Sequence, residues 1–481
     1  MTEGWIWLAC LVALPLLAAA ASLSPIGVER LRRISVILAG VMTAAAALFV
    51  SGPAASLSAG GPVPFPANLL RVSALSTALL PFAAGLWALT VAVTPRSALD
   101  RSGLGRTAVA TLITFTSFLT ENAVLLLVLW IGSVWTFLGA LSGSAQHRQR
   151  RIVAAYLGTS TVVFAVGVAL TSWRPFAGTS LDTAGLWLIV VAALIRKGIL
   201  PFHAWVPEVF DHGRLGPAVL FSAPQIGAYV TTVLVVPEAS PDVLRLVAVL
   251  ALGTAVYGAS LALVETSARR ACGYLFVSQS ALVMAGLDCT SAGALTGGLV
   301  LWLSSGIAFA GLARSVLVLE ARRGRMDLSR YHGGYNRMPV LAVSFLIMGL
   351  ACTGFPGTLS FAGQELLVSG AVEAFPVLGF AVVVASALTG LAVLRMYFAL
   401  FCGRPEVSAD PSVHLELRPS EAWSFAAVVI LLVALGIAPR LVVDSRFAAS
   451  DEILRQRQAR IERDTVAAAT DRAPEVGRTD R

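Results

Sequence analysis

Long apolar runs separated by short polar segments dominate this sequence. A helix needs about 20 apolar residues to cross a bilayer, and most of the runs approach that length. Because every backbone polar group must be paired inside lipid, we expect spans of this length to be helical. With 57% hydrophobic and 13% charged residues, the chain has too few polar side chains to cover a soluble globule. We therefore predict an all-α integral membrane protein with about 14 transmembrane helices. The runs lie near residues 4–22, 34–51, 72–95, 107–120, 122–142, 152–172, 183–200, 216–236, 243–264, 271–288, 292–318, 338–370, 374–402 and 422–440.

The loops between the runs alternate in charge, which orients the chain. Loops after odd-numbered runs carry most of the arginines, for example the three within 148–151 and the three within 322–325. Loops after even-numbered runs carry mainly acids, such as Glu121 and Asp288. By the positive-inside rule, the odd loops are cytoplasmic, and the net charge of +8 reflects membrane topology rather than nucleic-acid binding. We expect a multi-pass protein of a bacterial-type inner membrane, with both termini outside.

The charged tail after residue 441 fits this orientation poorly. Its segment "DEILRQRQARIERD" has mixed charges at helical spacing, and the residues that follow have the composition of a disordered segment. If the fourteenth run crosses the membrane, this arginine-bearing tail lies outside. Either the rule is weak for long tails or the last span is misplaced.

Two of the spans are interrupted by proline and glycine beside polar residues. The interruptions are "KGILPFHAWVP" at 197–207 and "TGFPGTLSFAGQE" at 353–365. Unpaired backbone at membrane depth is tolerated only where it is buried in protein or lines a wet cavity. The two breaks are five spans apart, and this odd offset predicts two inverted five-helix repeats, each with a broken helix, as in transporters. The predicted organisation is helices 1–3 in 1–106, repeats in 107–236 and 237–405, helix 14 in 406–441 and a polar tail in 442–481.

Several motifs resemble those of a known family. "LPFHAWVPEVF" resembles "PxHxWxPDA", "ARRACGYLFVSQ" resembles "KRxxAYSxxSQ", and "GGYNRMP" is similar to "GGLxxxMP". "GFPGTLSFAGQE" is similar to "GxPGTxxFxGE", and "LRMYFALFCG" to "RxYFxxFxG". These are motifs of the antiporter-like, proton-translocating membrane subunits of respiratory complex I, shared with Mrp cation/proton antiporters and membrane-bound hydrogenases. The resemblance covers roughly residues 107–405 and implies an ion-translocating subunit of a larger energy-coupling complex.

The chain departs from that family where the resemblance places relay residues. Ile131 stands at the position of the glutamate in the fifth span, Arg196 at that of the lysine in the seventh, and Gln364 at that of the charged residue in the twelfth. The bridging basic residue of span eight aligns with Phe221 or Gln225. In span eleven, serines 304 and 305 and alanine 308 stand where some members have histidine and lysine.

The single lysine of the chain, Lys197, follows Arg196 directly. Arginine is effectively always protonated, whereas a buried lysine can release its proton because desolvation disfavours the charged form. Lys197 is therefore a candidate proton carrier in a shifted pathway. The alternative is that its aliphatic stem snorkels to the cytoplasmic face.

Other charged residues near the interruptions are candidates for the same pathway. Intramembrane charges are functional candidates by default, and an arginine there is more often a fixed counter-charge than a carrier. The candidate pathway residues are Lys197, His203, Glu208, Asp211, Glu365 and Glu121, and the candidate counter-charges are Arg196, Arg314, Arg395 and Glu265. For Glu121 we favour a solvated turn over a relay role, and for His203 a structural hydrogen bond is as good an explanation as proton transfer.

Three functions stay open from the sequence. The first, which we favour, is a proton- or cation-translocating subunit of a larger complex. The second is a non-pumping membrane scaffold with a degenerate antiporter fold. The third is the proton-flux component of a two-component transporter such as inorganic-carbon uptake. We find no phosphate loop, dinucleotide fingerprint, metal-ligand set or nucleophile triad, so no cofactor is expected, and any catalysis, as in an NADH-quinone oxidoreductase or a hydrogenase, would occur in a redox or zinc-containing partner.

Overall fold

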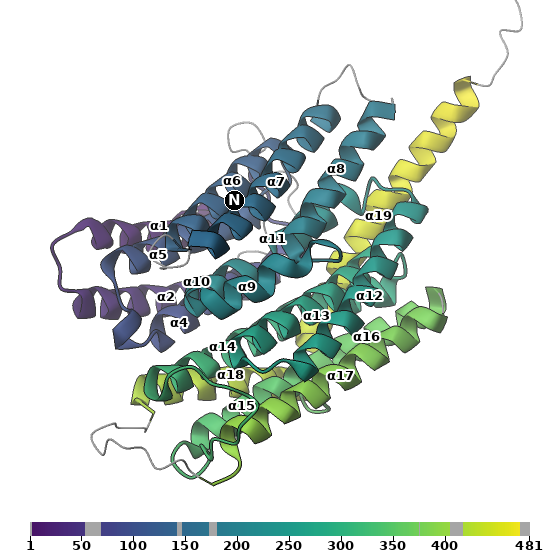
Figure 1. Cartoon of the computed structure of the whole chain (residues 1–481). Coiled ribbons are helices and arrows are strands. Elements are labelled where there is room, and N and C mark those ends of the chain that lie inside the picture. Colours follow the sequence, from purple (N-terminus) through teal and green to yellow (C-terminus); the bar gives the residue numbers. More distant parts are fainter. Residues whose placement is uncertain are drawn as a thin grey trace, which may run out of the picture.

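The computed structural model describes residues 2–52, 69–141, 147–172, 180–374, 376–404 and 417–471. Within these ranges the regular elements are helices, and β pairing is limited to one isolated bridge between Ser267 and Asp327. Figure 1 shows long helices running roughly along one direction and packed side by side. The predicted all-α membrane class is confirmed.

The chain reaches its first break through seven long helices. They are α1 (Thr2–Leu23), α2 (Val28–Ser51), α4 (Ala74–Val93), α5 (Arg101–Ser117), α6 (Ala123–Leu141), α7 (His147–Ser172) and α8 (Ser180–Lys197). Shorter elements follow: η4 (Phe202–Ala204), α9 (Trp205–His212), α10 (Leu215–Ser222), α11 (Ile226–Val230) and the π-helical turn η5 (Thr231–Val235). The remaining helices are α12 (Pro241–Val264), α13 (Ala268–Asp288), α14 (Ala292–Arg323), α15 (Pro339–Cys352), α16 (Leu359–Ala374), α17 (Pro376–Phe401), α18 (Pro419–Ile437) and α19 (Arg440–Asp471).

Twelve segments of the described chain are long and apolar enough to cross a membrane. The other two predicted spans correspond to α5, which has 17 residues, and to the pair α15 and α16, which are separated by a break. The count of fourteen therefore stays a prediction, as do the two inverted repeats and the domain boundaries.

Both predicted interruptions are present as helix breaks. Helix α8 ends at Lys197, and Gly198 follows with a φ of 69°, a conformation that glycine adopts without steric cost. A Cβ at Gly198 would also lie 2.6 Å from Val206 Cγ2, so any other residue here would be strained and would have to displace Val206. The second break separates α15 from α16 and contains two glycines with positive φ, Gly354 and Gly357.

A third break, between α10 and α11, was not predicted. Gln225 lies there with a φ of 53°, the only left-handed non-glycine residue in the described chain. Pro224 removes a backbone donor at this point, and that proline was the sequence signal for the break. The break turns the Gln225 side chain into the protein interior, where it is 5% exposed.

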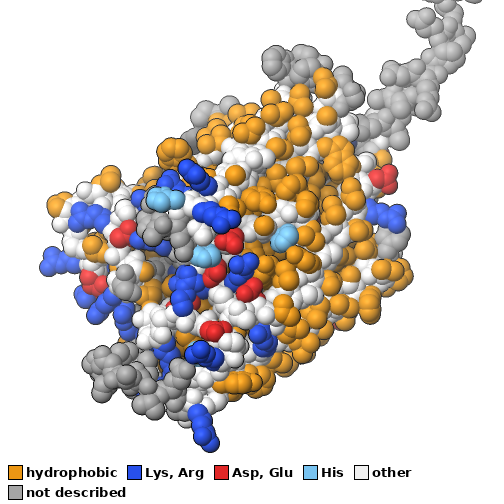
Figure 2. Space-filling view, in the orientation of Figure 1, with side chains coloured by type: hydrophobic (Ala, Val, Ile, Leu, Met, Phe, Trp, Pro, Cys, Tyr) orange, Lys and Arg blue, Asp and Glu red, His pale blue; other side chains and the backbone are white. Residues whose placement is uncertain are grey.

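The described loops gather at two opposite ends of the helices. At what we call the odd end, loops after odd-numbered spans contact each other: Arg101 donates to Ile26 O, and Arg322 pairs with Glu421. At the even end, loops after even-numbered spans meet, as in the pair of Arg71 with Glu121 at 2.9 Å. In Figure 2 most charged side chains of the visible face gather at one end, and hydrophobic ones cover much of the rest.

Helix α19 lies across the even end, which accounts for most of the predicted polar tail. Arg446 donates to Leu75 O at the start of α4, Ser450 bonds Thr296 near the start of α14, and Arg457 donates to Val236 O. The arginines of α19 therefore serve partly as donors to helix-end carbonyls. Their position is the one expected if α18 crosses the membrane. Residues 472–481 of the predicted tail lie outside the described residues.

Helices α13 and α14 form the centre of the molecule (Figure 1). Every residue of α13 is buried except for a few near its first turn. A Cβ on Gly286 of α13 would lie 2.7 Å from Gly298 Cα of α14, so glycine is required for the two backbones to approach. Polar residues carried by these two helices are thus held in the protein interior, next to the breaks.

Candidate functional site

Lys197 lies in the protein interior at the first break. Its side chain is 3% exposed, and Nζ donates to Gln225 Oε1 at 2.8 Å. Gly227 makes room for it, because a Cβ there would lie 2.9 Å from Lys197 Cγ. The ammonium group therefore ends on the third break rather than at a membrane surface, and the snorkelling alternative is wrong.

Asp288 is the described carboxylate whose charge acts on this ammonium group. It is the last residue of α13 and is 2% exposed, and its charge acts electrostatically on Lys197. Neither of its carboxylate oxygens has a hydrogen-bond partner within the described part of the chain. We predicted that Asp288 is a loop acid, which is wrong because α13 carries it into the packed region. The sequence feature that could have indicated its burial is its position at the end of an apolar run, next to Cys289.

Arg196 is a fixed cation beside Lys197. Its guanidinium lies 4.3 Å from the Trp130 ring centre and 4.6 Å from the Phe221 ring centre, so two aromatic rings hold it. Its Nη2 donates to Ser133 Oγ at 2.8 Å, and no carboxylate among the described residues pairs with it. Ile131, at the position assigned to the missing glutamate, is 46% exposed, so Trp130 and Ser133 are the α6 residues that contact this cation.

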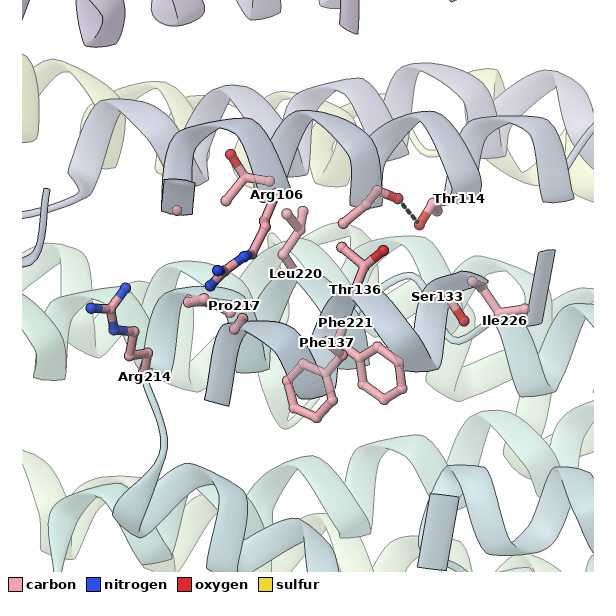
Figure 3. Close-up of a pocket in the computed structure, with 14 residues that line it drawn as sticks. Arg106, Thr114, Ser133, Thr136, Phe137, Arg214, Pro217, Leu220, Phe221 and Ile226 are labelled. Atoms are coloured by element: carbon pink, nitrogen blue, oxygen red, sulfur yellow. Dashed lines mark hydrogen bonds between the residues drawn. The ribbon is translucent and has the colours of Figure 1, made fainter. Parts of the chain in front are cut away.

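A cavity with a mostly apolar lining extends from Ser133, the partner of this cation, toward the odd end. Figure 3 shows Arg214 and Arg106 toward one end of the cavity and Thr114 and Ser133 toward the other, with Thr136 between them. Its volume is about 30 Å³, room for a water molecule. A smaller cavity of about 10 Å³ touches Arg196, Lys197, Gln225 and Ser280, and both cavities are lined by Phe221 and Ile226. The two cavities thus share a wall beside Arg196.

The acids of α9 lie away from Lys197, in an ion-pair network at the odd end. Glu208 pairs with Arg270 at 3.5 Å and with His212 at 3.3 Å, and Asp211 pairs with Arg325 at 2.7 Å. Because α9 continues toward the odd end after the break, nearness in sequence to Lys197 does not become nearness in space. The predicted counter-charge Glu265 belongs to this network through Arg270, at 3.3 Å.

His203 also lies apart from the lysine. It is half-buried and packs edge-on against Tyr257 of α12, with ring centres 5.0 Å apart. Arg395 donates to the carbonyl oxygens of Leu263 and Glu265, so it caps the end of α12. The contacts of both residues are therefore packing and capping contacts away from Lys197.

The two outlying acids, Glu121 and Glu365, are placed differently. Glu121 lies at the even end between α5 and α6, in a cavity of about 170 Å³ that Thr232 and Glu452 also line. Burial raises the pKa of its carboxyl, and the charge of Arg71 opposes this effect. Glu365 is exposed on α16. Neither contacts Lys197, and no cluster that could hold a metal ion occurs among the described residues.

Comparison with known proteins agrees with this architecture. The family model described as "NADH:quinone oxidoreductase/Mrp antiporter, TM" matches residues 156–389. NADH-quinone oxidoreductase subunit M of Pseudomonas aeruginosa is 28% identical over 307 residues, covering 61% of this chain and 59% of that protein. Subunit 14 of the Thermus thermophilus enzyme is 31% identical over 264 residues, covering 54% and 57%.

Solved structures share the fold over nearly the whole chain. A chain of the Mrp complex from Dietzia sp. DQ12-45-1b superposes with a TM-score of 0.82 at 18% identity, covering 94% of this chain and 98% of that one. A chain of respiratory complex I from Thermus thermophilus does so with a TM-score of 0.82 at 21% identity, covering 93% and 99%. Over residues 156–389 the chain matches this family model, and over nearly its whole length it has the fold of these solved chains. The resemblance found in the motifs is thereby confirmed, although the sequence matches span less than three fifths of the length of these curated relatives.

Proposed function

We propose that this protein carries protons, or another small cation, across a bacterial inner membrane as one subunit of a larger complex. The observation that carries the proposal is the buried Lys197 ammonium on Gln225, with the buried cation Arg196 directly before it in the chain and a buried carboxylate, Asp288, that has no hydrogen-bond partner in the described chain. A relay needs groups that can gain and lose a proton. An intramembrane amine and a carboxylate that has no hydrogen-bond partner are such groups.

Each group has its own part in the proposed relay. Water in the cavity beside Ser133 brings a proton from the odd end to the neighbourhood of Arg196. Arg196 stays charged and repels a second positive charge, so it favours release of the Lys197 proton rather than carrying it. The Lys197 ammonium releases its proton toward Asp288, whose carboxylate takes it up, and Gln225 holds the ammonium group in position before release.

The relay differs from the family pattern and uses fewer of the residues we expected. Glu208, Asp211 and His203 are not in contact with Lys197, so we assign them to the surface network and to packing. Glu121 remains a candidate for the even-end outlet, because its cavity also holds Glu452. We place the odd end in the cytoplasm and both termini outside, following the arginine distribution.

Partners are expected along the membrane plane. The solved structures that share this fold are chains of multi-subunit membrane complexes. Glu365 presents a carboxylate at the surface of a membrane-spanning helix pair, where contact with lipid would be costly. A neighbouring subunit that covers α16 would remove this cost.

The scaffold function is the second candidate, and one observation favours it. Arg196 faces a serine instead of a carboxylate, so no ion pair forms at the place where the family has a glutamate and a lysine. A chain that only anchors a partner would retain the fold and lose that pair.

The test is to purify the chain with its native partners and reconstitute the assembly in sealed vesicles. A dye that reports internal pH should show potential-driven proton uptake, whereas vesicles with the Lys197→Gln assembly should stay near the leak of empty vesicles. Equal uptake by both assemblies would reject the relay and favour the scaffold. Mass spectrometry of the copurified chains would separate a respiratory complex, with iron-sulfur subunits, from a carbon-uptake system, with a zinc protein.

A further inference from the structure

The third break, between α10 and α11, places Gln225 beside Lys197. Gln225 has a left-handed φ of 53°, and its side chain accepts the hydrogen bond from Lys197 Nζ at 2.8 Å. A residue other than glycine keeps such a backbone conformation only where its surroundings over-determine it. The contacts that hold this break therefore also hold the acceptor of the Lys197 ammonium group.

The indole of Trp302, on α14, is one of these contacts. Its Nε1 donates to Pro224 O at 3.0 Å, and the side chain is 0% exposed. In an unbroken helix the Ala228 amide would donate to Pro224 O, but it donates to Gln225 O at 2.8 Å instead. Trp302 thus supplies, from another helix, a donor that the break takes away.

Neighbouring groups fix the position of this indole. Phe118 packs edge-on against it, with ring centres 6.2 Å apart. On the next turn of α14, a Cβ at Gly306 would lie 3.4 Å from Ala223 O, so the backbone of α14 passes close to the break. The indole therefore cannot leave Pro224 without displacing packed groups.

A second indole holds the Lys197 side of the pair. Trp205 Nε1 donates to Ile195 O at 2.8 Å, near the end of α8. By contrast, the indole Nε1 atoms of Trp87 and Trp130 are buried without a hydrogen-bond partner in the described part of the chain. The indoles that donate to the backbone at the breaks are thus the two beside the proposed carrier.

The charged groups that face Lys197 come from α8 and α13. Arg196 precedes it in the chain, and the charge of Asp288 acts on it. His203 of η4 packs against α12 instead. Trp302 is uncharged, so it acts on Lys197 through the position of Gln225.

Arg314, the predicted counter-charge on the same helix as Trp302, is placed differently. Its side chain is 0% exposed, and Nη2 donates to Thr90 Oγ1 of α4 and to Gly216 O of α10, each at 2.9 Å. It therefore holds the start of α10 rather than the third break.

We propose that Trp302 is a positioning residue that holds Gln225 on the Lys197 amine and thereby sets how tightly this amine holds its proton. It links α14, in the second predicted repeat, to the proposed carrier in the first. The inference rests on the proposed function of Lys197, but its test requires no proton flux.

Lys197 can be observed alone because it is the only lysine of the chain. When carbon-13 lysine is supplied during expression, the purified full chain in detergent carries one labelled lysine, and its Cε signal follows the protonation of Nζ in an NMR titration. A hydrogen bond to the charged form favours that form, so loss of the acceptor should move the titration midpoint to lower pH. Gln225→Leu is the reference and should move the midpoint by about 1–2 pH units.

Trp302→Phe removes the indole donor and keeps a ring against Phe118. The midpoint should move in the same direction as in Gln225→Leu, by at least about 0.5 pH unit. The double variant should have the midpoint of Gln225→Leu, because Trp302 acts through Gln225. If Trp302→Phe does not fold, Trp302→Met takes its place, since it also lacks the donor and its flexible side chain fills the space.

Trp87→Phe is the matched control. Trp87 of α4 is also 0% exposed, but its Nε1 has no hydrogen-bond partner in the described chain. The variant loses the same part of the ring from the core without removing a donor to a break. Its titration midpoint should stay at the native value.

Three results would overturn the positioning role: a native midpoint in the Trp302 variant, an equal shift in Trp87→Phe, or a further shift when Trp302→Phe is added to Gln225→Leu. A lower unfolding temperature with a native midpoint would make Trp302 a packing residue only. A native chain whose lysine signal does not titrate would refute the proposed carrier itself, and the positioning role with it.

Discussion

The hydrogen bond between Lys197 and Gln225 gives a prediction whose size follows from the structure. Both side chains are buried, at 3% and 5% exposure, and Nζ and Oε1 are 2.8 Å apart. A hydrogen bond to a charged group contributes about 1.5–3 kcal/mol. Gln225→Leu removes the acceptor and leaves the ammonium group without it, so we expect the free energy of unfolding to fall by at least about 1.5 kcal/mol.

A double-mutant cycle isolates this interaction from the strain of the Gln225 backbone. Leucine at position 225 has to adopt the same left-handed φ of 53° whether residue 197 is lysine or methionine, so that strain cancels in the cycle. Unfolding is followed by titrating the detergent-solubilised native, Gln225→Leu, Lys197→Met and double variants with a denaturing detergent. We expect a coupling energy of about 1.5–3 kcal/mol. A coupling below about 0.5 kcal/mol would refute the placement of a charged Lys197 on Gln225, because that is the size found for independent sites.

Three further predictions concern charges elsewhere. Asp288→Asn should lower proton flux in vesicles at least about tenfold, because an amide cannot take up the proton that Lys197 releases; undiminished flux would remove Asp288 from the relay. Arg322→Ala should lower the free energy of unfolding by about 3–5 kcal/mol, since it leaves Glu421 buried and unpaired, whereas Arg455→Ala, in an exposed pair, should cost less than about 1 kcal/mol. Burial raises the pKa of the Glu121 carboxyl above its ordinary 4.5, so the folded state holds this proton more tightly than the unfolded state. The stability of the native chain relative to Glu121→Gln should therefore fall as pH rises from about 4 to about 7, and a flat or rising difference in the unfolding midpoint would contradict this.

The sequence was sufficient to predict the helical membrane fold and the two glycine- and proline-containing breaks. Both features depend on local chemistry: the length of the apolar runs, and residues that cannot continue a helix. The break at Gln225 was missed because Pro224 stands alone in an apolar run without a neighbouring glycine cluster. The tail helix across the even end was missed as a packed element because its buried arginines resemble solvent-exposed ones in sequence.

The relay residues were harder to predict because spatial contact depends on helix direction. Glu208 and Asp211 follow Lys197 closely in sequence, but the second half of the broken helix carries them to the odd end. Asp288 is 91 positions away and yet acts on Lys197, because α13 passes through the centre of the molecule. No local pattern in the sequence could have shown that pairing.

Proton flux through the Lys197→Arg assembly tests the central claim most directly. Arginine keeps the positive charge, but in water it holds its proton about 2 pK units or more tightly than lysine, so flux should fall by about 100-fold or more. Arg330→Lys, an exchange in an exposed loop, is the control and should conduct like the native assembly. If the Lys197→Arg assembly is intact and its flux stays within about twofold of native, protons do not pass through residue 197 and the account is wrong.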